Sequence, residues 1–249
     1  ISALVDITNY VTYDLGRPLH VFDTAHVNGD IRPRMGRAGE VMLALDGKTY
    51  ELDEEVCVIG DESEHAEGLG GVMGGEDSGC TESTTEVFIE CAYFDPVRTA
   101  TTGRKLNIMS DARYRFERGV DPAFTLPGLE AATRMILDIC GGEASEVVQD
   151  GARLPTDRAY KLDTDRVASL VGMDIPAETQ RKTLQDLGFT LKDGMAHPPS
   201  WRPDVKGEAD LVEEVARIAS LTKLEGRPMP RPQAGVPKPV LTVAQQRER

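Results

Sequence analysis

The sequence predicts a mixed α/β (α+β) fold, in which a sheet-based domain precedes a small α+β domain. Three patterns support this fold class. An Asp-Gly pair separates two apolar runs within residues 41–52, which is a strong hairpin signal. Apolar runs at 56–61 and 86–94 are typical of strands. Apolar side chains recur at helical spacing within 126–140 and 207–221, so helices accompany the strands.

The N-terminal part is expected to consist of strands joined by turns. Residues 5–11 (VDITNYV) are apolar and rich in β-branched side chains, so they predict a strand. In the hairpin at 41–52, Asp46 and Gly47 both tolerate the positive φ that a two-residue turn requires. The later two apolar runs flank a glycine-rich loop.

Helices are expected to follow the strands. Residues 126–140 form one of them, and Gly141-Gly142 ends it, as a left-handed cap would. Residues 143–158 are polar and contain Gly and Pro, so a domain boundary is expected there. The expected parts are a first domain at 1–151, a small α+β domain at 152–226 and a Pro-rich linker at 227–249.

The second domain is expected to combine helices near 163–172, 176–187 and 207–221 with a short strand–turn–strand. The turn passes through Asp193-Gly194, which again tolerates positive φ. The helix at 207–221 carries its apolar residues in one stripe, which predicts that it packs on the rest of this domain.

Composition excludes several classes of protein. No apolar run approaches the roughly 20 residues that cross a bilayer, and no basic-then-apolar signal segment opens the chain. The four cysteines form no C-x-x-C pair, so we expect reduced thiols in a cytoplasmic protein and no zinc site. The chain opens at Ile1 without Met, from which we expect a piece of a longer protein.

The net charge of −14 argues against nucleic-acid binding, because phosphate contacts dominate that affinity. The charge is uneven, however. Residues 223–249 hold six basic and two acidic side chains, so the preceding residues carry −18. Composition alone therefore gives no support for an RNA partner.

The loop GLGGVMGG (68–75) holds five glycines in eight residues. It lacks the Lys-Ser/Thr of a P-loop, and Met73 stands where a dinucleotide fingerprint has its third glycine. Glycine is nevertheless needed where a ligand approaches the backbone closely or where φ is positive. The loop is therefore either a tight connection without a ligand or part of a site that is not a nucleotide-phosphate cradle.

His20 and Glu90 are two candidate site residues. A lone histidine is more often a hydrogen-bonded structural residue than a catalytic one. Glu90 lies in the apolar run VFIECAYF, and strand alternation places it on one face with Phe88 and Ala92. A carboxylate on a half-buried strand must be paired, so Glu90 is either an ion-pair partner or a ligand contact.

The segment SDARYRFERGVD (110–121) is dense in alternating charge. Its plain interpretation is a salt-bridge lattice that joins the sheet to the next helix. A second charged group consists of four carboxylates before and along the helix at 207–221, namely Asp204, Asp210, Glu213 and Glu214. Carboxylates at i, i+3 and i+4 share one helix face, so they suit a Mg²⁺ ion; otherwise they form a solvated acidic face that complements the helix dipole.

Several segments match one family in the same order: VDITNYV with DLGRPLHVFD, GLGGVMGGEDS, IECAYFDPVRT and SDARYRFERGVDP. They resemble the editing domain in the beta subunit of bacterial-type phenylalanyl-tRNA synthetases. PPSWRPDVKGEADLVEEVARI is similar to the hallmark of the next domain of that family, and PVLTVAQQRER to the entry of its catalytic-like module. Several motifs in one order are more specific than any one of them. The chain is therefore identified as a fragment covering the editing domain and the following small domain.

The resemblance implies an aminoacyl-tRNA synthetase of the cytoplasm, a ligase of protein biosynthesis. The expected partners are phenylalanine tRNA, the alpha subunit and a second beta subunit, in a tetramer of two alpha and two beta subunits. ATP is used by the whole enzyme and is not expected to bind here. The editing domain would hydrolyse the ester of tyrosine mischarged onto the phenylalanine tRNA. The alternative is a structural or tRNA-positioning module whose editing has lapsed.

The resemblance also assigns roles to individual residues. His20 and Glu90 would be catalytic, with Glu90 accepting the tyrosine hydroxyl proton and His20 holding the terminal adenosine or the attacking water. The pair Arg113-Tyr114 stands where the family commonly has Ser-His. The other implied substrate-binding residues are Thr8, Asn9, Gly71, Gly74, Ser110 and Ala112, and the implied ligands of a Mg²⁺ shared with the alpha subunit are Asp204, Asp210, Glu213 and Glu214.

Overall fold

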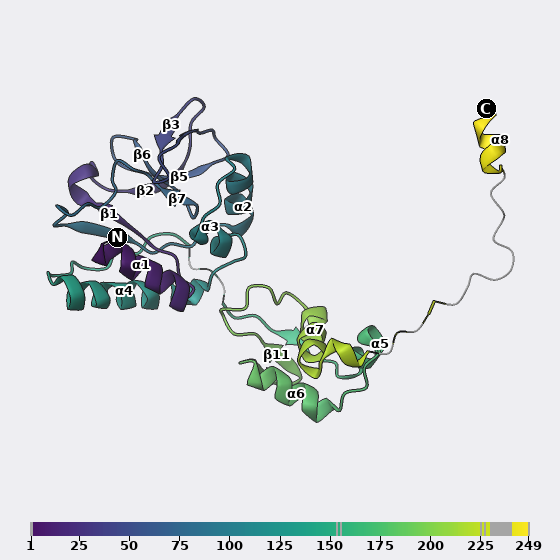
Figure 1. Cartoon of the computed structure of the whole chain (residues 1–249). Helices are drawn as coiled ribbons and strands as arrows, with labels where there is room; N and C mark the ends of the chain where they lie inside the picture. The colour runs from purple at the N-terminus through teal and green to yellow at the C-terminus, as the bar shows by residue number, and fades with distance from the viewer. Residues whose placement is uncertain are drawn as a thin grey trace.

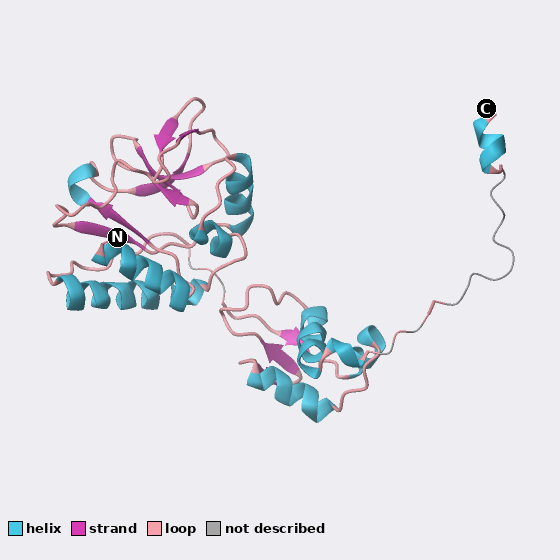
Figure 2. Ribbon diagram, viewed as in Figure 1, coloured by secondary structure: helices cyan, strands magenta, loops and turns pink. Residues whose placement is uncertain are grey.

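The computed structural model describes residues 2–152, 154, 156–224, 226, 228–229 and 241–248. Figure 1 shows a larger N-terminal part and a smaller part that follows it. Strands are concentrated in the first part, and both parts contain helices (Figure 2). The expected mixed α/β fold class is confirmed.

The first part contains four α-helices and eight strands among the residues that the structure describes. The helices are α1 (Ala3–Asp14), α2 (Pro96–Lys105), α3 (Asp111–Phe116) and α4 (Thr125–Cys140), with short 3-10 turns η1 (Thr24–His26) and η2 (Pro122–Phe124). The strands are β1 (His20–Asp23), β2 (Arg32–Met35), β3 (Val41–Leu43), β4 (Thr49–Glu51), β5 (Cys57–Gly60), β6 (Ala66–Leu69), β7 (Met73–Gly74) and β8 (Val87–Glu90).

All of these strands pair antiparallel. One sheet has the order β2-β5-β6-β7, and two further pairs are β1-β8 and β3-β4. The β3-β4 pair is the hairpin expected from the Asp-Gly signal, and Gly47 takes φ +75° in its turn. Bridges from Phe22 to Gly79 and from Ala44 to Gly75 tie both pairs to the glycine loop and the segment after it.

The expectation of a strand at residues 5–11 is wrong, because this segment lies within helix α1. The Ser2 side chain caps the helix by accepting a hydrogen bond from the Val5 N–H at 3.3 Å. Ile7 and Val11 are buried, and they pack with Ala132 and Ile136 of α4. Burial of one helical face thus outweighs the β-branched composition of the segment.

Helix α4 confirms the expected helix at 126–140. Gly141 follows it with φ +77°, a conformation that glycine adopts without steric cost. Helices α1 and α4 lie side by side along the lower edge of the first part in Figure 1, beneath the β1-β8 pair. These two helices therefore support the strands that carry His20 and Glu90.

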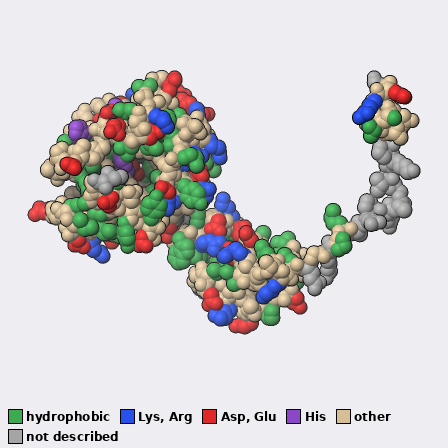
Figure 3. Space-filling view, in the orientation of Figure 1, with side chains coloured by type: hydrophobic (Ala, Val, Ile, Leu, Met, Phe, Trp, Pro, Cys, Tyr) green, Lys and Arg blue, Asp and Glu red, His purple; other side chains and the backbone are tan. Residues whose placement is uncertain are grey.

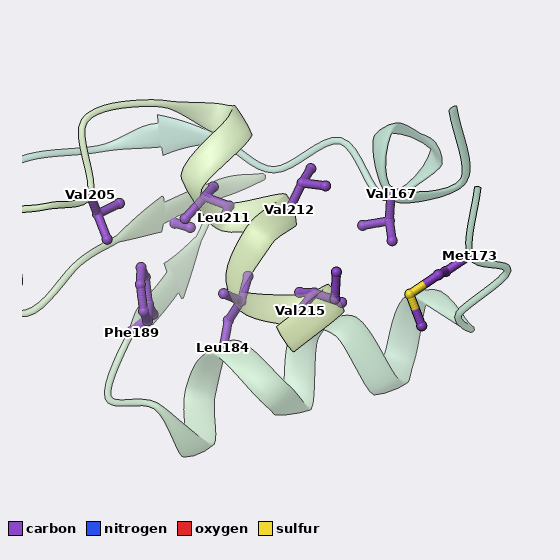
Figure 4. Packing of buried hydrophobic residues seen from close by; sticks show 10 residues of the cluster. Val167, Met173, Leu184, Phe189, Val205, Leu211, Val212 and Val215 are labelled. Carbon is purple, nitrogen blue, oxygen red and sulfur yellow. The ribbon is translucent and has the colours of Figure 1, made fainter. Parts of the chain in front are cut away.

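The second part has its own core. Its elements are β9 (Tyr160–Lys161), α5 (Asp165–Val171), α6 (Ala177–Asp186), β10 (Thr190–Lys192), β11 (Met195–His197), α7 (Glu208–Ala219) and the 3-10 turn η3 (Leu221–Lys223), with strand order β10-β11-β9. Figure 4 shows Leu184 of α6 and Phe189 pointing toward Leu211 and Val215 of α7. The three expected helices and the Asp193-Gly194 turn are confirmed, and α7 packs on this domain through its apolar stripe.

The hydrophobic clusters lie either within the first 136 residues or within residues 160–219. The limits at 151 and 226 stay predictions, since the residues around them are described with gaps. Most of the expected linker at 227–249 lies outside the described residues, although a short helix α8 (Val243–Arg247) is described within it. Among the helices that the structure describes, none has the length and apolar character needed to span a membrane.

Candidate functional site

A cavity of about 70 Å³ lies where β1 and β8 meet the glycine loop and α3. Figure 3 shows a hollow in this face of the first part. The residues that line the cavity are mainly apolar or glycine, with one imidazole and one carboxyl group among them: Pro18, Leu19, His20, Phe22, Ile59, Gly68, Leu69, Gly71, Val72, Met73, Gly74, Glu90, Phe94, Ala112 and Phe116. A largely apolar lining with a few convergent polar groups is typical of a ligand site, and the volume is smaller than the roughly 300–1,000 Å³ of most small-molecule pockets.

His20 and Glu90 are directly opposite one another in the antiparallel pairing of β1 with β8. Opposed residues of an antiparallel pair place their side chains on the same face, so both groups enter the cavity. The His20 ring also packs edge-on against Phe22, with ring centroids 4.4 Å apart. Two residues that are 70 positions apart in the sequence are thus brought together by strand register.

Burial sets the protonation of both groups. It raises the pKa of the Glu90 carboxyl to about 7, because the charged form loses its hydration. It lowers the pKa of His20 to about 4 for the same reason, so the imidazole is neutral at pH 7. His20 Nε2 is buried and has no hydrogen-bond partner among the described residues. The cavity therefore holds a neutral imidazole with a free ring nitrogen and a carboxyl group that titrates near neutrality.

Two glycines of the loop are required by their surroundings. A Cβ at Gly74 would lie 2.3 Å from Cε1 of His20, so only glycine lets the imidazole lie against this strand. Gly71 takes φ +71°, and a Cβ there would lie 2.9 Å from Phe94. The N–H groups of Val72 and Gly75 donate to Leu69 and Glu67 carbonyls. The Gly71 N–H donates to no described residue, and Gly71 lines the cavity.

We expect Gly74→Ala to displace the His20 ring, because the added methyl group would overlap it. Overpacking of this kind costs about 1–3 kcal/mol of unfolding free energy. Gly68→Ala is the matched control on the paired strand, since its Cβ would meet only ordinary contacts at 3.6 Å and 3.7 Å. The midpoints of thermal unfolding of the two variants check this expectation. Equal midpoints would show that the His20 ring does not depend on Gly74.

Three residues expected in the site do not line this cavity. Thr8 and Asn9 lie on helix α1, where the Thr8 hydroxyl donates to the Val5 carbonyl at 2.9 Å. The Ser110 hydroxyl donates to the Val72 carbonyl at 2.5 Å and accepts from the Arg113 N–H at 3.0 Å. Ser110 therefore holds the glycine loop against the start of α3. The other three expected substrate-binding residues, Gly71, Gly74 and Ala112, do line the cavity.

The charged segment at 110–121 forms ion pairs, but they lie within α3 and its C-terminal cap and do not link the sheet to the next helix. Arg113 pairs with Glu117 at 3.0 Å, and Arg115 pairs with Asp111 at 3.2 Å. A Cβ at Gly103 would lie 2.1 Å from Nε of Arg113, so the buried guanidinium occupies space left by that glycine. Arg113 thus points toward α2 and leaves the cavity unobstructed.

The four acidic residues near α7 do not form a metal site in this structure. Arg202 pairs with Asp204 at 2.6 Å and with the buried Glu214 at 2.9 Å, and Arg217 also pairs with Glu214. The Asp210 carboxylate accepts the Lys206 N–H at 2.7 Å. Within the described part of the chain, no group of three or more His, Cys, Asp or Glu side chains is arranged to hold a metal. Asp204 and Glu214 are therefore held by arginine here, and the four residues stay a prediction for a site shared with another subunit.

The cavity is also lined by aromatic residues that the sequence patterns did not indicate. Phe94 and Phe116 pack edge-to-face, with ring centroids 5.2 Å apart, and both line the cavity with Phe22. Phe94 lies inside the motif IECAYFDPVRT and Phe116 inside SDARYRFERGVDP, so the motifs could have indicated both as site residues. Spacing alone could not show that residues 22 positions apart share one wall.

Comparisons with known proteins identify relatives of both parts of the chain. Residues 1–141 match the B3/4 domain family model, and residues 160–220 match the tRNA synthetase B5 domain model. The chain is 67% identical over 248 residues to a phenylalanine–tRNA ligase beta subunit of Cereibacter sphaeroides, covering 100% of this chain and 31% of that protein. It is 57% identical over 251 residues to one of Paramagnetospirillum magneticum, covering 99% of this chain and 31% of that protein.

The chain thus spans about a third of the length of these relatives. A crystal structure of an N-terminal fragment of the phenylalanyl-tRNA synthetase beta subunit from Pyrococcus horikoshii is 14% identical, with a TM-score of 0.39 over 85% of this chain and 64% of that one. A likeness at this level carries no argument.

Proposed function

The chain belongs to the family of phenylalanine–tRNA ligase beta subunits as a segment with a B3/4 and a B5 domain, and we propose that its cavity hydrolyses mischarged tyrosyl-tRNA. The observation that carries this proposal is the pairing of His20 with Glu90 across β1 and β8, inside a cavity walled by glycine and phenylalanine. The substrate would be the ester that joins tyrosine to the 3′ end of phenylalanine tRNA.

The cavity suits the selection of tyrosine over phenylalanine. A pocket built for an apolar ring rejects an added hydroxyl only weakly, so a ligase for phenylalanine needs a second site that recognises this hydroxyl. No described residue donates a hydrogen bond to the Glu90 carboxylate, which leaves both oxygens as acceptors. Ionised Glu90 would accept the tyrosine hydroxyl, while Phe94 and Phe116 would surround the ring.

The lining favours direct attack by water. None of the described residues that line the cavity is Ser, Thr, Cys or Lys, so the wall offers no hydroxyl, thiol or amine nucleophile for an acyl-enzyme. Water would attack the ester carbonyl and form a tetrahedral oxyanion, to which the free Gly71 N–H can donate. The neutral His20 ring would orient the water through Nε2. The bond to the ribose oxygen then breaks, and that oxygen takes the proton that water loses.

Release of tyrosine from tyrosyl-tRNA by the chain tests the proposal, with phenylalanyl-tRNA as the comparison substrate. We expect His20→Ala to lower the hydrolysis rate about 10- to 100-fold, because the attacking water loses its positioning group. His20 titrates far below neutrality, so the wild-type rate should show no inflection from this residue between pH 5.5 and 8. His65, an exposed histidine paired with Asp77, provides the control variant His65→Ala.

Two outcomes would contradict the proposal. A chain that releases no tyrosine would be a structural or tRNA-positioning module. Trapping of an acyl-enzyme would contradict the direct attack by water.

We further propose that the whole beta subunit joins the alpha subunit in a tetramer of two alpha and two beta subunits in the cytoplasm. Use of ATP and the attachment of phenylalanine would belong to that assembly. The segment at 160–220 would support the assembly through its folded surface. No step is assigned to Mg²⁺, because two of the four carboxylates implied as its ligands, Asp204 and Glu214, are paired with arginine.

A further inference from the structure

Two exposed tyrosines lie on α1 and on α3, the helix that also lines the cavity, and each has an arginine stacked on it. The guanidinium of Arg118 lies 3.8 Å from the ring centroid of Tyr114, and that of Arg115 lies 5.0 Å from the ring centroid of Tyr13. Tyr13 is 62% exposed and Tyr114 is 55% exposed, although residues of this size are commonly half-buried or more. We call these four residues the tyrosine–arginine platform.

The platform is fixed in place by α1 and α3, of which α3 also lines the cavity. The Tyr13 hydroxyl donates to the Asp111 carboxylate at 2.5 Å, which joins the end of α1 to the start of α3. On α3, Ala112 and Phe116 line the cavity, whereas Tyr114 and Arg115 belong to the platform. One helix therefore presents a cavity wall on one side and stacking groups on another.

Three of the four platform residues, Tyr114, Arg115 and Arg118, belong to the basic stretch of an acidic chain. Residues 96–118 hold six basic and two acidic side chains, while residues 1–222 as a whole carry −18. Figure 3 shows Lys and Arg side chains along the edge of the first part where α2 and α3 lie. Arg104 of α2 is exposed, and no ion pair joins it to a described residue. A polyanion that approaches this acidic protein would therefore be drawn to this edge.

Exposed aromatic rings combined with basic groups bind unpaired nucleotides, because each base can stack on a ring while arginine meets the phosphate. A duplex offers no free base face for such stacking. We propose that the tyrosine–arginine platform binds the single-stranded 3′ end of tRNA and directs its terminal nucleotide into the adjoining cavity. This inference rests on the proposed function, and it names the surface that holds the substrate outside the reacting ester.

Binding of a fluorescent 12-nucleotide single-stranded RNA to the 249-residue chain, followed by anisotropy, tests the platform. Tyr114→Ala should weaken binding about tenfold, since a base–aromatic stack is lost, whereas Tyr114→Phe should bind as the wild type. Arg118→Ala should weaken binding and reduce the slope of log affinity against log salt by about 0.7. Arg181→Ala is the control, because Arg181 is an exposed helical arginine of the second part with a loose pair to Glu178 at 3.8 Å.

Several results would overturn the inference: unchanged binding by Tyr114→Ala, equal loss in Tyr114→Phe, equal loss in Arg181→Ala, or a duplex of the same length bound as tightly as the single strand. Unfolding midpoints of the variants identify any loss that arises from misfolding. Arg118→Lys keeps the charge without the planar stack, so its binding of the single-stranded RNA shows the effect of the stack separately from that of the charge.

Two esters separate this inference from the proposed function. Tyrosyl-adenosine reaches the cavity without using the platform, whereas tyrosyl-tRNA uses both. Tyr114→Ala should leave hydrolysis of tyrosyl-adenosine unchanged and slow that of tyrosyl-tRNA at limiting concentration. If the wild-type chain hydrolyses neither ester, the proposed function fails, and the anisotropy measurements still decide the platform. If both esters are hydrolysed and Tyr114→Ala slows neither, the platform alone fails.

Discussion

Glu90→Ala is expected to lower the hydrolysis of tyrosyl-tRNA about 100-fold while changing that of phenylalanyl-tRNA little. The reason is that a site built to bond a hydroxyl loses most when the partner disappears and the polar group of the substrate is left unpaired in a buried position. Glu90 faces the cavity from β8, opposite His20, and no other carboxylate lines the cavity within the described residues. Rates measured with both substrates under single-turnover conditions give the selectivity directly.

The pH dependence of this selectivity follows from the ionisation of Glu90. Its pKa is raised to about 7, and the ionised form is the one that accepts a hydroxyl proton. Selectivity for tyrosine should therefore increase as the pH rises through about 7. Glu90→Gln should remove this increase, because the amide does not titrate.

Glu86→Ala supplies the matched control, since Glu86 is an exposed carboxylate that immediately precedes the same strand. It should change neither rate nor pH profile. If Glu90→Ala still discriminates tyrosine from phenylalanine as the wild type does, then Glu90 does not contact the hydroxyl.

The elements that local signals dictate could be predicted from the sequence. The Asp46-Gly47 turn and the end of α4 at Gly141 depend on positive φ, which a few residue types supply. The sequence predicts a strand where helix α1 lies, because β-branched residues are frequent within residues 5–11. The Ser2 cap and the spacing of Leu4, Ile7 and Val11 were the competing helical signal, and contact with α4 decides between them.

The site was predictable only in part, for a physical reason. Strand alternation could show that Glu90 faces a half-buried side, but the register that sets it opposite His20 is a long-range property. The four carboxylates near α7 illustrate the reverse problem. Their spacing is suited to a shared face, yet Glu214 is buried and paired with Arg202. Counting the acidic residues along the helix does not reveal this pair, because Arg202 precedes the helix.

Arg202→Met is expected to lower the unfolding free energy of the second domain by about 2–3 kcal/mol. Arg202 donates to Glu214 on α7 at 2.9 Å and to Asp204 at 2.6 Å, so it ties the loop before the helix to the helix itself. Glu214 is only 5% exposed, and without Arg202 its remaining ion-pair partner among the described residues is Arg217. Trp201 is the sole tryptophan of the chain and lies beside Arg202, so its fluorescence reports unfolding of this domain. Arg181→Met, which removes an exposed pair, should cost about 0.5 kcal/mol or less.

The same variant should change how this domain responds to acid. Hydrogen bonds from Arg202 lower the pKa of both Asp204 and Glu214 below their ordinary values. A carboxyl group whose folded pKa is lowered contributes stability above its unfolded pKa, and this contribution is lost as the pH falls through the folded pKa. The wild type should therefore lose stability as the pH drops below about 4.5, the region where unfolded carboxylates take up protons. Arg202→Met should be less stable at pH 7 and should lose less on acidification, because only Arg217 still holds Glu214 ionised. Parallel pH profiles for wild type and variant would show that the Arg202 pairs do not contribute to the pH dependence of stability, and Asp204 and Glu214 would then be free of Arg202.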